Sequence, residues 1–107
     1  MKKILLCCAA GMSTSMVVQR MEKAAKEKNI AVEIDAVGLE EFSEQVSGRD
    51  CCLLGPQIKY KLADFAPLAA ELNKPIAVIN TIDYGMMNGE KILTEALSMI
   101  ENARIAQ

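Results

Sequence analysis

The stretch ILLCCAAGMSTSMVVQRM, Ile4–Met21, joins three kinds of sequence in eighteen residues. An apolar run ends in Cys7 and Cys8, a loop of small and hydroxylated residues follows, and a segment with helical periodicity comes last. This order predicts a strand that passes through a tight turn into a helix, the first unit of an α/β fold. The turn therefore marks the carboxyl end of the first strand.

Apolar runs and helical patterns alternate along the rest of the chain. The predicted strands are Lys3–Cys7, Ala31–Val37, Cys51–Gly55 and Ile76–Asn80. The predicted helices are Ser13–Lys28, Glu40–Val46, Ile58–Leu72 and Gly89–Ala103, with a kink or a break expected at Pro67. Strict alternation predicts an α/β fold: a four-stranded parallel sheet in the order 2-1-3-4, with helices on both faces.

Length and composition limit the classes of protein that this chain can represent. With 107 residues, it is expected to form a single domain over residues 1–107. The net charge of −2 and the lack of a basic block argue against a nucleic-acid partner. No apolar run approaches the roughly 20 residues that span a bilayer. No targeting segment is apparent, so we expect a cytoplasmic protein.

The chain contains no histidine and four cysteines, in the adjacent pairs Cys7–Cys8 and Cys51–Cys52. Without histidine, the commonest general base and the commonest metal ligand are missing. Neighbouring residues of a strand point to opposite faces, so adjacent thiols do not converge on one ion. We therefore expect no metal and no diffusible cofactor, and we interpret Cys51 and Cys52 as core residues.

The loop after the first strand has the composition of an anion cradle. Small residues allow close backbone approach, and hydroxyl groups and a helix N-terminus can donate to a phosphoryl group. The same positive field favours a thiolate, which can accept a phosphoryl group covalently. The expected phosphate-binding residues are Ala9, Ala10, Gly11, Met12, Ser13, Thr14 and Ser15. The alternative is an ordinary first βα turn with a cysteine that only packs.

The two cysteines of this stretch are assigned different roles. Cys7 completes the apolar run and is expected to pack in the core, whereas Cys8 lies where strand becomes loop. Thiol phosphatases use the pattern C-x5-R followed by Ser or Thr, and counting from Cys8 places Thr14 where that arginine belongs. Without arginine, the charge clamp on a phosphoryl group in transit is weaker. A site that accepts phosphate but hydrolyses it poorly suits a carrier.

The loop C-x-A-G-M-S-T-S that starts at Cys8, with LLGPQI at Leu53–Ile58 and IDYGMMNG at Ile82–Gly89, resembles a known family over essentially the whole chain. It is similar to the enzyme IIB subunit of the lactose/cellobiose class of the bacterial sugar phosphotransferase system. The resemblance implies a fold similar to that of low-molecular-weight tyrosine phosphatases. It also implies that Cys8 is the active cysteine.

The resemblance further implies a reaction and its partners. The subunit enzyme IIA carries phosphohistidine and passes the phosphoryl group to Cys8. The phosphocysteine then phosphorylates a β-linked disaccharide during transport by the membrane subunit enzyme IIC, to which the protein docks. The chain is then a protein-cysteine phosphotransferase that is monomeric when free. The resemblance does not identify the sugar.

Other residues are expected at the same edge of the sheet, with alternatives that the sequence leaves open. Pro56 and Gln57 follow the third strand and form either the rim of the site and a docking surface, or only a helix start with proline near its first position. Tyr84 either faces this edge or packs in the core. Met12 is interpreted as a partner contact and Met16 as helix packing.

Rival functions use the same residues differently. In a thiol phosphatase, Asp83 would protonate the leaving phenol, but the missing arginine argues against this alternative. A non-catalytic docking module would not need Cys8. A thiol–disulfide protein is the weakest alternative, because a bridge between neighbouring strand residues is strained.

Overall fold

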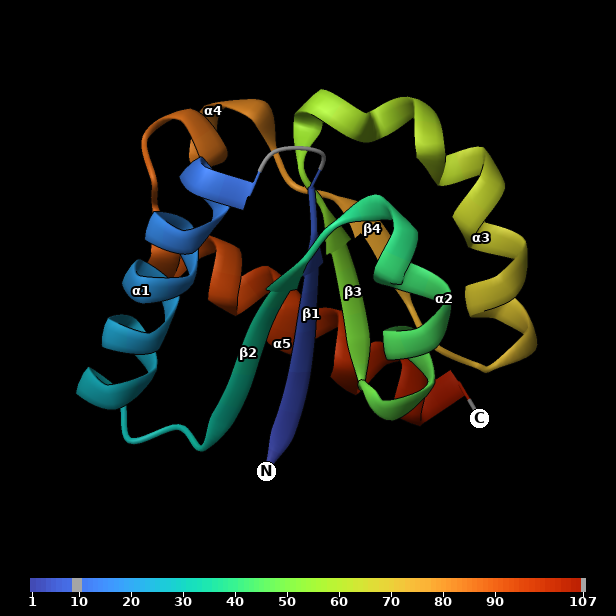
Figure 1. The fold of residues 1–107 in the computed structure, drawn as a ribbon. Coiled ribbons are helices and arrows are strands. Elements are labelled where there is room, and N and C mark those ends of the chain that lie inside the picture. Colours follow the sequence, from blue (N-terminus) through green and yellow to red (C-terminus); the bar gives the residue numbers. More distant parts are fainter. Residues whose placement is uncertain (9–10, 107) are drawn as a thin grey trace.

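The computed structural model describes residues 1–8 and 11–106 of the chain, and for residues 11–13 and 106 the backbone alone. Within these residues, the strands β1 (Lys2–Cys7), β2 (Val32–Val37), β3 (Cys51–Leu54) and β4 (Ile76–Val78) form one parallel sheet in the order β2-β1-β3-β4. The predicted strand order is confirmed. All strands point towards the same edge, at the top of Figure 1.

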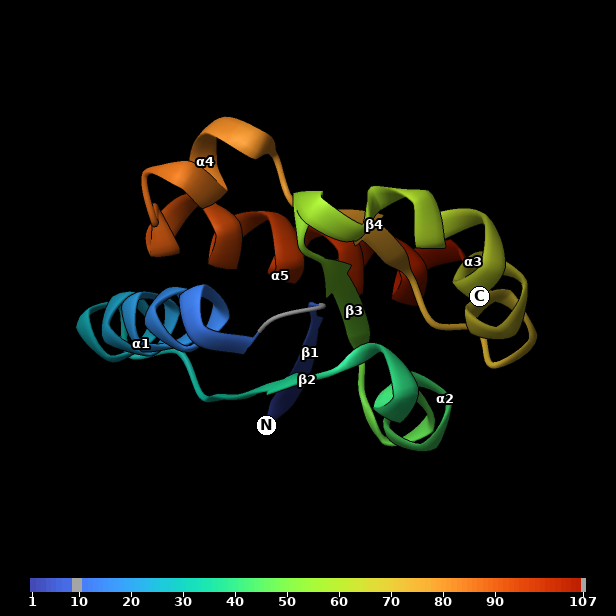
Figure 2. The ribbon, with the colours of Figure 1, turned by 45° about the horizontal axis from the view of Figure 1, so that its top comes forward.

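Helices cover both faces of this sheet, as the sequence predicts. The helices α1 (Gly11–Glu27) and α5 (Gly89–Ala106) lie side by side on one face (Figure 2). The helices α2 (Phe42–Gln45) and α3 (Leu62–Glu71) cover the other. Two separate hydrophobic clusters result, one on each face of the sheet.

The strand β1 lies between β2 and β3 and contributes to both hydrophobic clusters. Ile4 and Leu6 pack in the cluster below α1 and α5, and Leu5 and Cys7 pack in the cluster below α2 and α3. This division follows from the two-residue period of a strand. A strand that is buried on both faces reads as a continuous apolar run, which explains the sequence ILLC.

The structure corrects several predicted boundaries. The predicted helix Glu40–Val46 is a series of short turns: the 3-10 helices η1 (Leu39–Glu41) and η2 (Val46–Gly48) flank α2. Pro67 does not break the helix: α3 continues through it, and its ring lies on an exposed face. The change of helix type falls earlier, where the 3-10 helix η3 (Pro56–Lys61) meets α3.

The predicted fourth strand is also too long. It ends at Val78, and Asn80 instead caps a short helix, α4 (Thr81–Gly85), which the sequence analysis does not predict. The Asn80 side chain accepts hydrogen bonds from the backbone N–H groups of Ile82 and Asp83, at 2.9 and 3.2 Å. An asparagine in this position satisfies two of the donors that a helix start leaves unpaired.

The helices α1 and α5 approach each other closely at Gly89. A Cβ atom at this position would lie 2.3 Å from the backbone carbon of Arg20 and 2.5 Å from the nitrogen of Met21. Since these neighbours are backbone atoms, no side-chain rotation relieves the overlap. Glycine is therefore required here by the packing of two helices, in addition to starting α5.

Gly89→Ala is expected to lower the free energy of unfolding by about 1–3 kcal/mol, the typical cost of forcing extra atoms into a packed interior. Chemical denaturation measures this change. The matched control is Gly85→Ala, because nothing lies within 4 Å of the added Cβ. A Gly89→Ala protein as stable as the Gly85→Ala protein would contradict the close approach.

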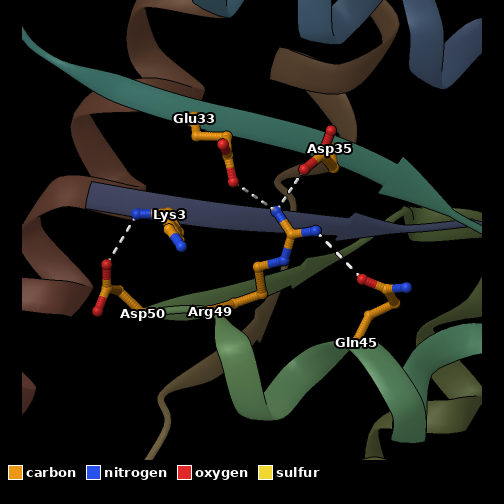
Figure 3. Close-up of polar contacts among 6 residues, drawn as sticks. All are labelled: Lys3, Glu33, Asp35, Gln45, Arg49 and Asp50. Atoms are coloured by element: carbon orange, nitrogen blue, oxygen red, sulfur yellow. Dashed lines mark hydrogen bonds and ion pairs between the residues drawn. The ribbon is translucent and has the colours of Figure 1, made fainter. Parts of the chain in front are cut away.

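A cluster of charged and polar groups ties the edge strand β2 to the segment before β3 (Figure 3). The Arg49 guanidinium contacts the carboxylates of Glu33, at 3.5 Å, and Asp35, and donates to the Gln45 side-chain oxygen at 3.2 Å. Only 12% of the Arg49 side chain is exposed. Its planar group, with several donors, suits this three-way contact better than a lysine ammonium would.

Arg49→Met is expected to cost about 1–2 kcal/mol in the free energy of unfolding, because it leaves two half-exposed carboxylates facing each other without a cation. The control is Arg104→Met, which removes an exposed pair with Glu101 within α5. The control variant is expected to keep the denaturation midpoint of the wild type. Equal stability of the two variants would show that the Arg49 cluster contributes no more than a surface ion pair.

Candidate functional site

The candidate site lies at the edge of the sheet where the strands end. Cys8 follows β1, Gly55 follows β3 and precedes η3, and α4 begins shortly after β4. The N-terminal end of α1, the start of η3 and α4 gather around this edge, at the top of Figure 1. In open parallel sheets, the crevice beyond the strand ends is where ligands bind, at the point where the strand order reverses.

Backbone hydrogen bonds to both neighbouring segments hold the end of β1. The Cys8 N–H donates to the Val37 carbonyl at 3.1 Å, and the Gly55 N–H donates to the Cys7 carbonyl at 2.9 Å. The Cys8 backbone therefore continues the sheet although the residue follows the strand. Because these bonds fix the direction of the Cys8 side chain, its sulfur has a defined position at the sheet edge.

Three segments that are distant in the sequence meet at the Cys8 sulfur. The Sγ atom lies 3.9 Å from Gln57 Oε1 and 3.8 Å from the Tyr84 hydroxyl, both within hydrogen-bond reach of sulfur. The Tyr84 hydroxyl also lies 3.2 Å from the Thr14 hydroxyl. Cys8, Thr14 and Tyr84 are buried, whereas Gln57 is exposed. Gln57 therefore borders the site from the solvent side.

Gly55 makes room for this arrangement. A Cβ atom at Gly55 would lie 2.9 Å from Gln57 Oε1 and 3.3 Å from the Cys8 sulfur. The missing side chain thus allows the amide of Gln57 and the thiol of Cys8 to meet over the backbone. Pro56 is the first residue of η3, as expected for a helix start with proline near its first position, and this helix brings Gln57 Oε1 to 3.9 Å from the Cys8 sulfur.

Tyr84 reaches the site because of α4. Its backbone N–H donates to the Asn80 carbonyl at 2.9 Å, and the Asn80 side chain caps the helix. The ring is buried in the cluster below α1 and α5, while its hydroxyl faces Cys8. Tyr84 therefore both packs in the core and faces the sheet edge. Asn80 is a helix-start signal in the sequence, and it could have predicted the helix that brings Tyr84 to the sheet edge.

The remaining cysteines are buried in apolar surroundings. Burial, together with the nearby charges of Cys8, Glu40 and Glu41, raises the pKa of Cys7 to about 11. Burial and the charge of Asp50 raise the pKa of Cys51 to about 12, and burial also raises the pKa of Cys52 well above its usual range. These thiols therefore stay neutral at physiological pH, and the interpretation of Cys51 and Cys52 as core residues is confirmed.

Part of the predicted phosphate loop can be located. Ala9 and Ala10 lie outside the described residues; Gly11, Met12 and Ser13 form the first turn of α1, and their side chains lie outside the description. Thr14 is 1% exposed, and Ser15 is exposed. The prediction that Met16 packs is wrong, because 45% of it is exposed.

The electrostatics of this edge favour an anion. The helix α1 begins three residues after Cys8 and has no acidic residue in its first turn, so its positive dipole end is not offset there. The arginines of the chain lie elsewhere: Arg49 contacts β2, Arg104 pairs with Glu101, and Arg20 lines a different cavity. Unlike in C-x5-R phosphatases, position 14 is filled by a neutral, buried threonine.

Asp83, the residue that a thiol phosphatase would use as its acid, is paired with a lysine in this structure. The residue is 5% exposed, and its carboxylate pairs with the Lys91 ammonium at 3.7 Å. The contact of α4 with the sulfur comes instead from the neighbouring Tyr84.

A cavity of about 390 Å³ opens beside the sulfur's neighbours. Its lining comes from the start of η3 and from α4: Pro56, Gln57, Lys59, Thr81, Tyr84 and Gly85. Among residues 1–8 and 11–106, no group of three metal-binding side chains is close enough to hold an ion. Along the described part of the chain, no helix is long and apolar enough to cross a membrane.

Comparisons with known proteins agree over nearly the whole chain. Residues 3–95 match the family described as "PTS system, Lactose/Cellobiose specific IIB subunit". The chain is 38% identical to the oligo-beta-mannoside-specific EIIB component of Bacillus subtilis, over 95% of this chain and 99% of that protein. It is 39% identical to the galactose-specific EIIB component of Lactococcus lactis subsp. cremoris, over 92% and 96%.

A solved structure extends this agreement to the fold. The solution structure of the cellobiose-specific phosphotransferase IIB component from Borrelia burgdorferi superposes with a TM-score of 0.81 at 47% identity. The match covers 95% of this chain and 94% of that one. The chain therefore belongs to the lactose/cellobiose-specific family of IIB subunits of the phosphotransferase system.

Proposed function

We propose that this protein is a phosphoryl carrier in which Cys8 accepts a phosphoryl group from phosphohistidine of an enzyme IIA and passes it to a sugar carried by the membrane subunit enzyme IIC. The observation that carries the proposal is the position of the Cys8 sulfur, at the end of β1 and ahead of the first turn of α1. Its neighbours Gln57 and Tyr84 are neutral side chains.

The proposed transfer balances without a base in this chain. In the first step, the Cys8 sulfur attacks phosphorus, the S–P bond forms and the N–P bond breaks. The thiol gives up its proton to become the attacking thiolate, and the imidazole nitrogen that leaves takes up one proton. In the second step, a sugar hydroxyl attacks, the O–P bond forms, the S–P bond breaks, and the hydroxyl proton ends on the sulfur. A chain without histidine suits this scheme, because each leaving atom takes up the proton.

The expected cradle for the phosphoryl group is residues 9–15, through their backbone N–H groups and the hydroxyls of Ser13 and Ser15. A phosphate at a helix N-terminus gains from unpaired N–H donors and from the dipole. Pro56, Gln57 and Tyr84 border this position and are proposed to contact the partners. The cavity that they line is the proposed approach of a partner that carries the phosphoryl group.

The sugar is proposed to be a β-linked disaccharide. The relatives differ in the sugars that their names give, from oligo-beta-mannoside to galactose and cellobiose, at nearly equal similarity to this chain. Sequence similarity alone therefore does not choose among them.

The carrier is tested by intact mass spectrometry after incubation with phosphoenolpyruvate, the general phosphotransfer proteins and a cognate enzyme IIA. Wild type and Cys7→Ser are expected to gain one phosphoryl group, and Cys8→Ser none, because Cys8 follows the end of β1 at the sheet edge, whereas Cys7 packs in the cluster below α2 and α3. Cys7→Ser is the matched control, since it removes the adjacent thiol. No gain in the wild type, with an enzyme IIA that is competent on another IIB, would refute the proposal.

Aryl phosphate hydrolysis separates the carrier from the rival thiol phosphatase. We expect wild type to release no more phenol than Cys8→Ser, because no arginine contacts the transferring group and Asp83 pairs with Lys91. The measurement is phenolate absorbance with p-nitrophenyl phosphate at several pH values. Turnover that depends on Cys8 would favour the phosphatase instead.

A further inference from the structure

Three side chains form a buried row that leads away from the candidate nucleophile. The Cys8 sulfur lies 3.8 Å from the Tyr84 hydroxyl, which lies 3.2 Å from the Thr14 hydroxyl. Thr14 is 1% exposed and Tyr84 is 7% exposed. The two hydroxyls come from different helices, α1 and α4, and both are held inside the protein. Buried hydroxyls of this kind depend on one another for hydrogen bonding.

The number of hydrogens decides the direction of these bonds. Each hydroxyl has one hydrogen to donate and also accepts. When the sulfur is a neutral thiol, its hydrogen can go to Gln57 Oε1, 3.9 Å away, or to the Tyr84 oxygen, so either direction along the row is possible. A thiolate has no hydrogen and only accepts. Tyr84 must then donate to the sulfur for that contact to exist, and its oxygen is left to accept the hydrogen of Thr14.

We propose that Tyr84 donates its phenolic hydrogen to the Cys8 thiolate, and that Thr14 is a positioning residue that orients this hydrogen by donating its own to the phenolic oxygen. The inference deepens the proposed function and rests on it for its use, because the thiolate is the form that attacks a phosphoryl donor.

The position of Thr14 in the chain supports this assignment. Thr14 stands six residues after Cys8, where the C-x5-R pattern has its arginine. A guanidinium would stabilise the charge on the sulfur and also clamp a phosphoryl group bidentately. The hydroxyl pair stabilises the sulfur without adding a positive charge. Nucleophile stabilisation is thereby separated from the charge clamp that promotes hydrolysis.

The surrounding structure holds the row in place. Tyr84 is fixed by its ring in the cluster below α1 and α5 and by the capped start of α4. Thr14 is the fourth residue of α1. The next buried residues of this helix, Val17 and Met21, pack in the hydrophobic cluster between α1 and the sheet.

The test is a titration of the Cys8 thiol by NMR, with cysteine labelled with ¹³C at Cβ and the Cys8 signal assigned by its loss in Cys8→Ser. Tyr84→Phe keeps the ring and removes the hydroxyl. We expect its titration midpoint to rise by about 0.5–1 pH unit, the range for losing one hydrogen bond to a charged group at a long sulfur distance. The matched control is Tyr60→Phe, at an exposed tyrosine, which should leave the midpoint unchanged.

Thr14 is tested by a double-mutant cycle. Thr14→Val is expected to raise the midpoint by less than Tyr84→Phe does, and Thr14→Ser to restore the wild-type value. The double variant Tyr84→Phe/Thr14→Val should titrate like Tyr84→Phe alone, because Thr14 acts through the phenolic oxygen. Thr94→Val, on an exposed face of α5, controls for the loss of a hydroxyl.

An unchanged or lowered midpoint in Tyr84→Phe, with amide spectra that show an intact fold, would overturn the proposal. A lowered midpoint would mean that Tyr84 accepts from the thiol. Full additivity in the double variant would overturn the role of Thr14. If Tyr84→Phe does not fold, Thr14→Val and Thr14→Ser decide by the same criterion. The titration needs no phosphoryl donor, so failure of the carrier function leaves its result standing.

Discussion

The central place of β1 is the constraint on which the rest of the structure depends. The strand β1 pairs with β2 on one side and with β3 on the other. Its carboxyl end therefore lies between two strands, and the connections before and after β2 run on opposite faces of the sheet. The helix α1 turns to one face, while the segment after β2 turns to the other. At the end of β1, the connecting segments thus diverge to the two faces of the sheet, and Cys8 lies at this point.

Much of the fold could be predicted from the sequence because its signals are long and periodic. The run ILLC is apolar on both faces only if helices cover both, and this determines the place of β1. Short elements escaped prediction for the opposite reason. The five residues of α4 carry too little periodicity to be recognised as a helix.

For the site, the sequence predicts that Cys8, Thr14, Gln57 and Tyr84 share one edge of the sheet, but it does not predict the contacts between them. The difference between Cys7 and Cys8 follows from strand alternation, a local property. The meeting of Thr14 with Tyr84 follows from the packing of α1 against α4, and no spacing in the chain encodes that contact. The role of Gly55 could not be predicted for the same reason. A side chain is excluded there only because Gln57 and the Cys8 sulfur lie close to its backbone in the folded protein.

The helix α4 is too short to be stable without tertiary contacts. Its anchor is Tyr84, and its outer face presents Ile82 and Met86, which are 69% and 70% exposed. Any change at the sulfur that strengthens or weakens its contact with the Tyr84 hydroxyl therefore changes the free energy needed to detach α4. By thermodynamic linkage, a molecule that binds this outer face only when α4 is docked has an affinity that depends on the chemical state of a sulfur it never touches.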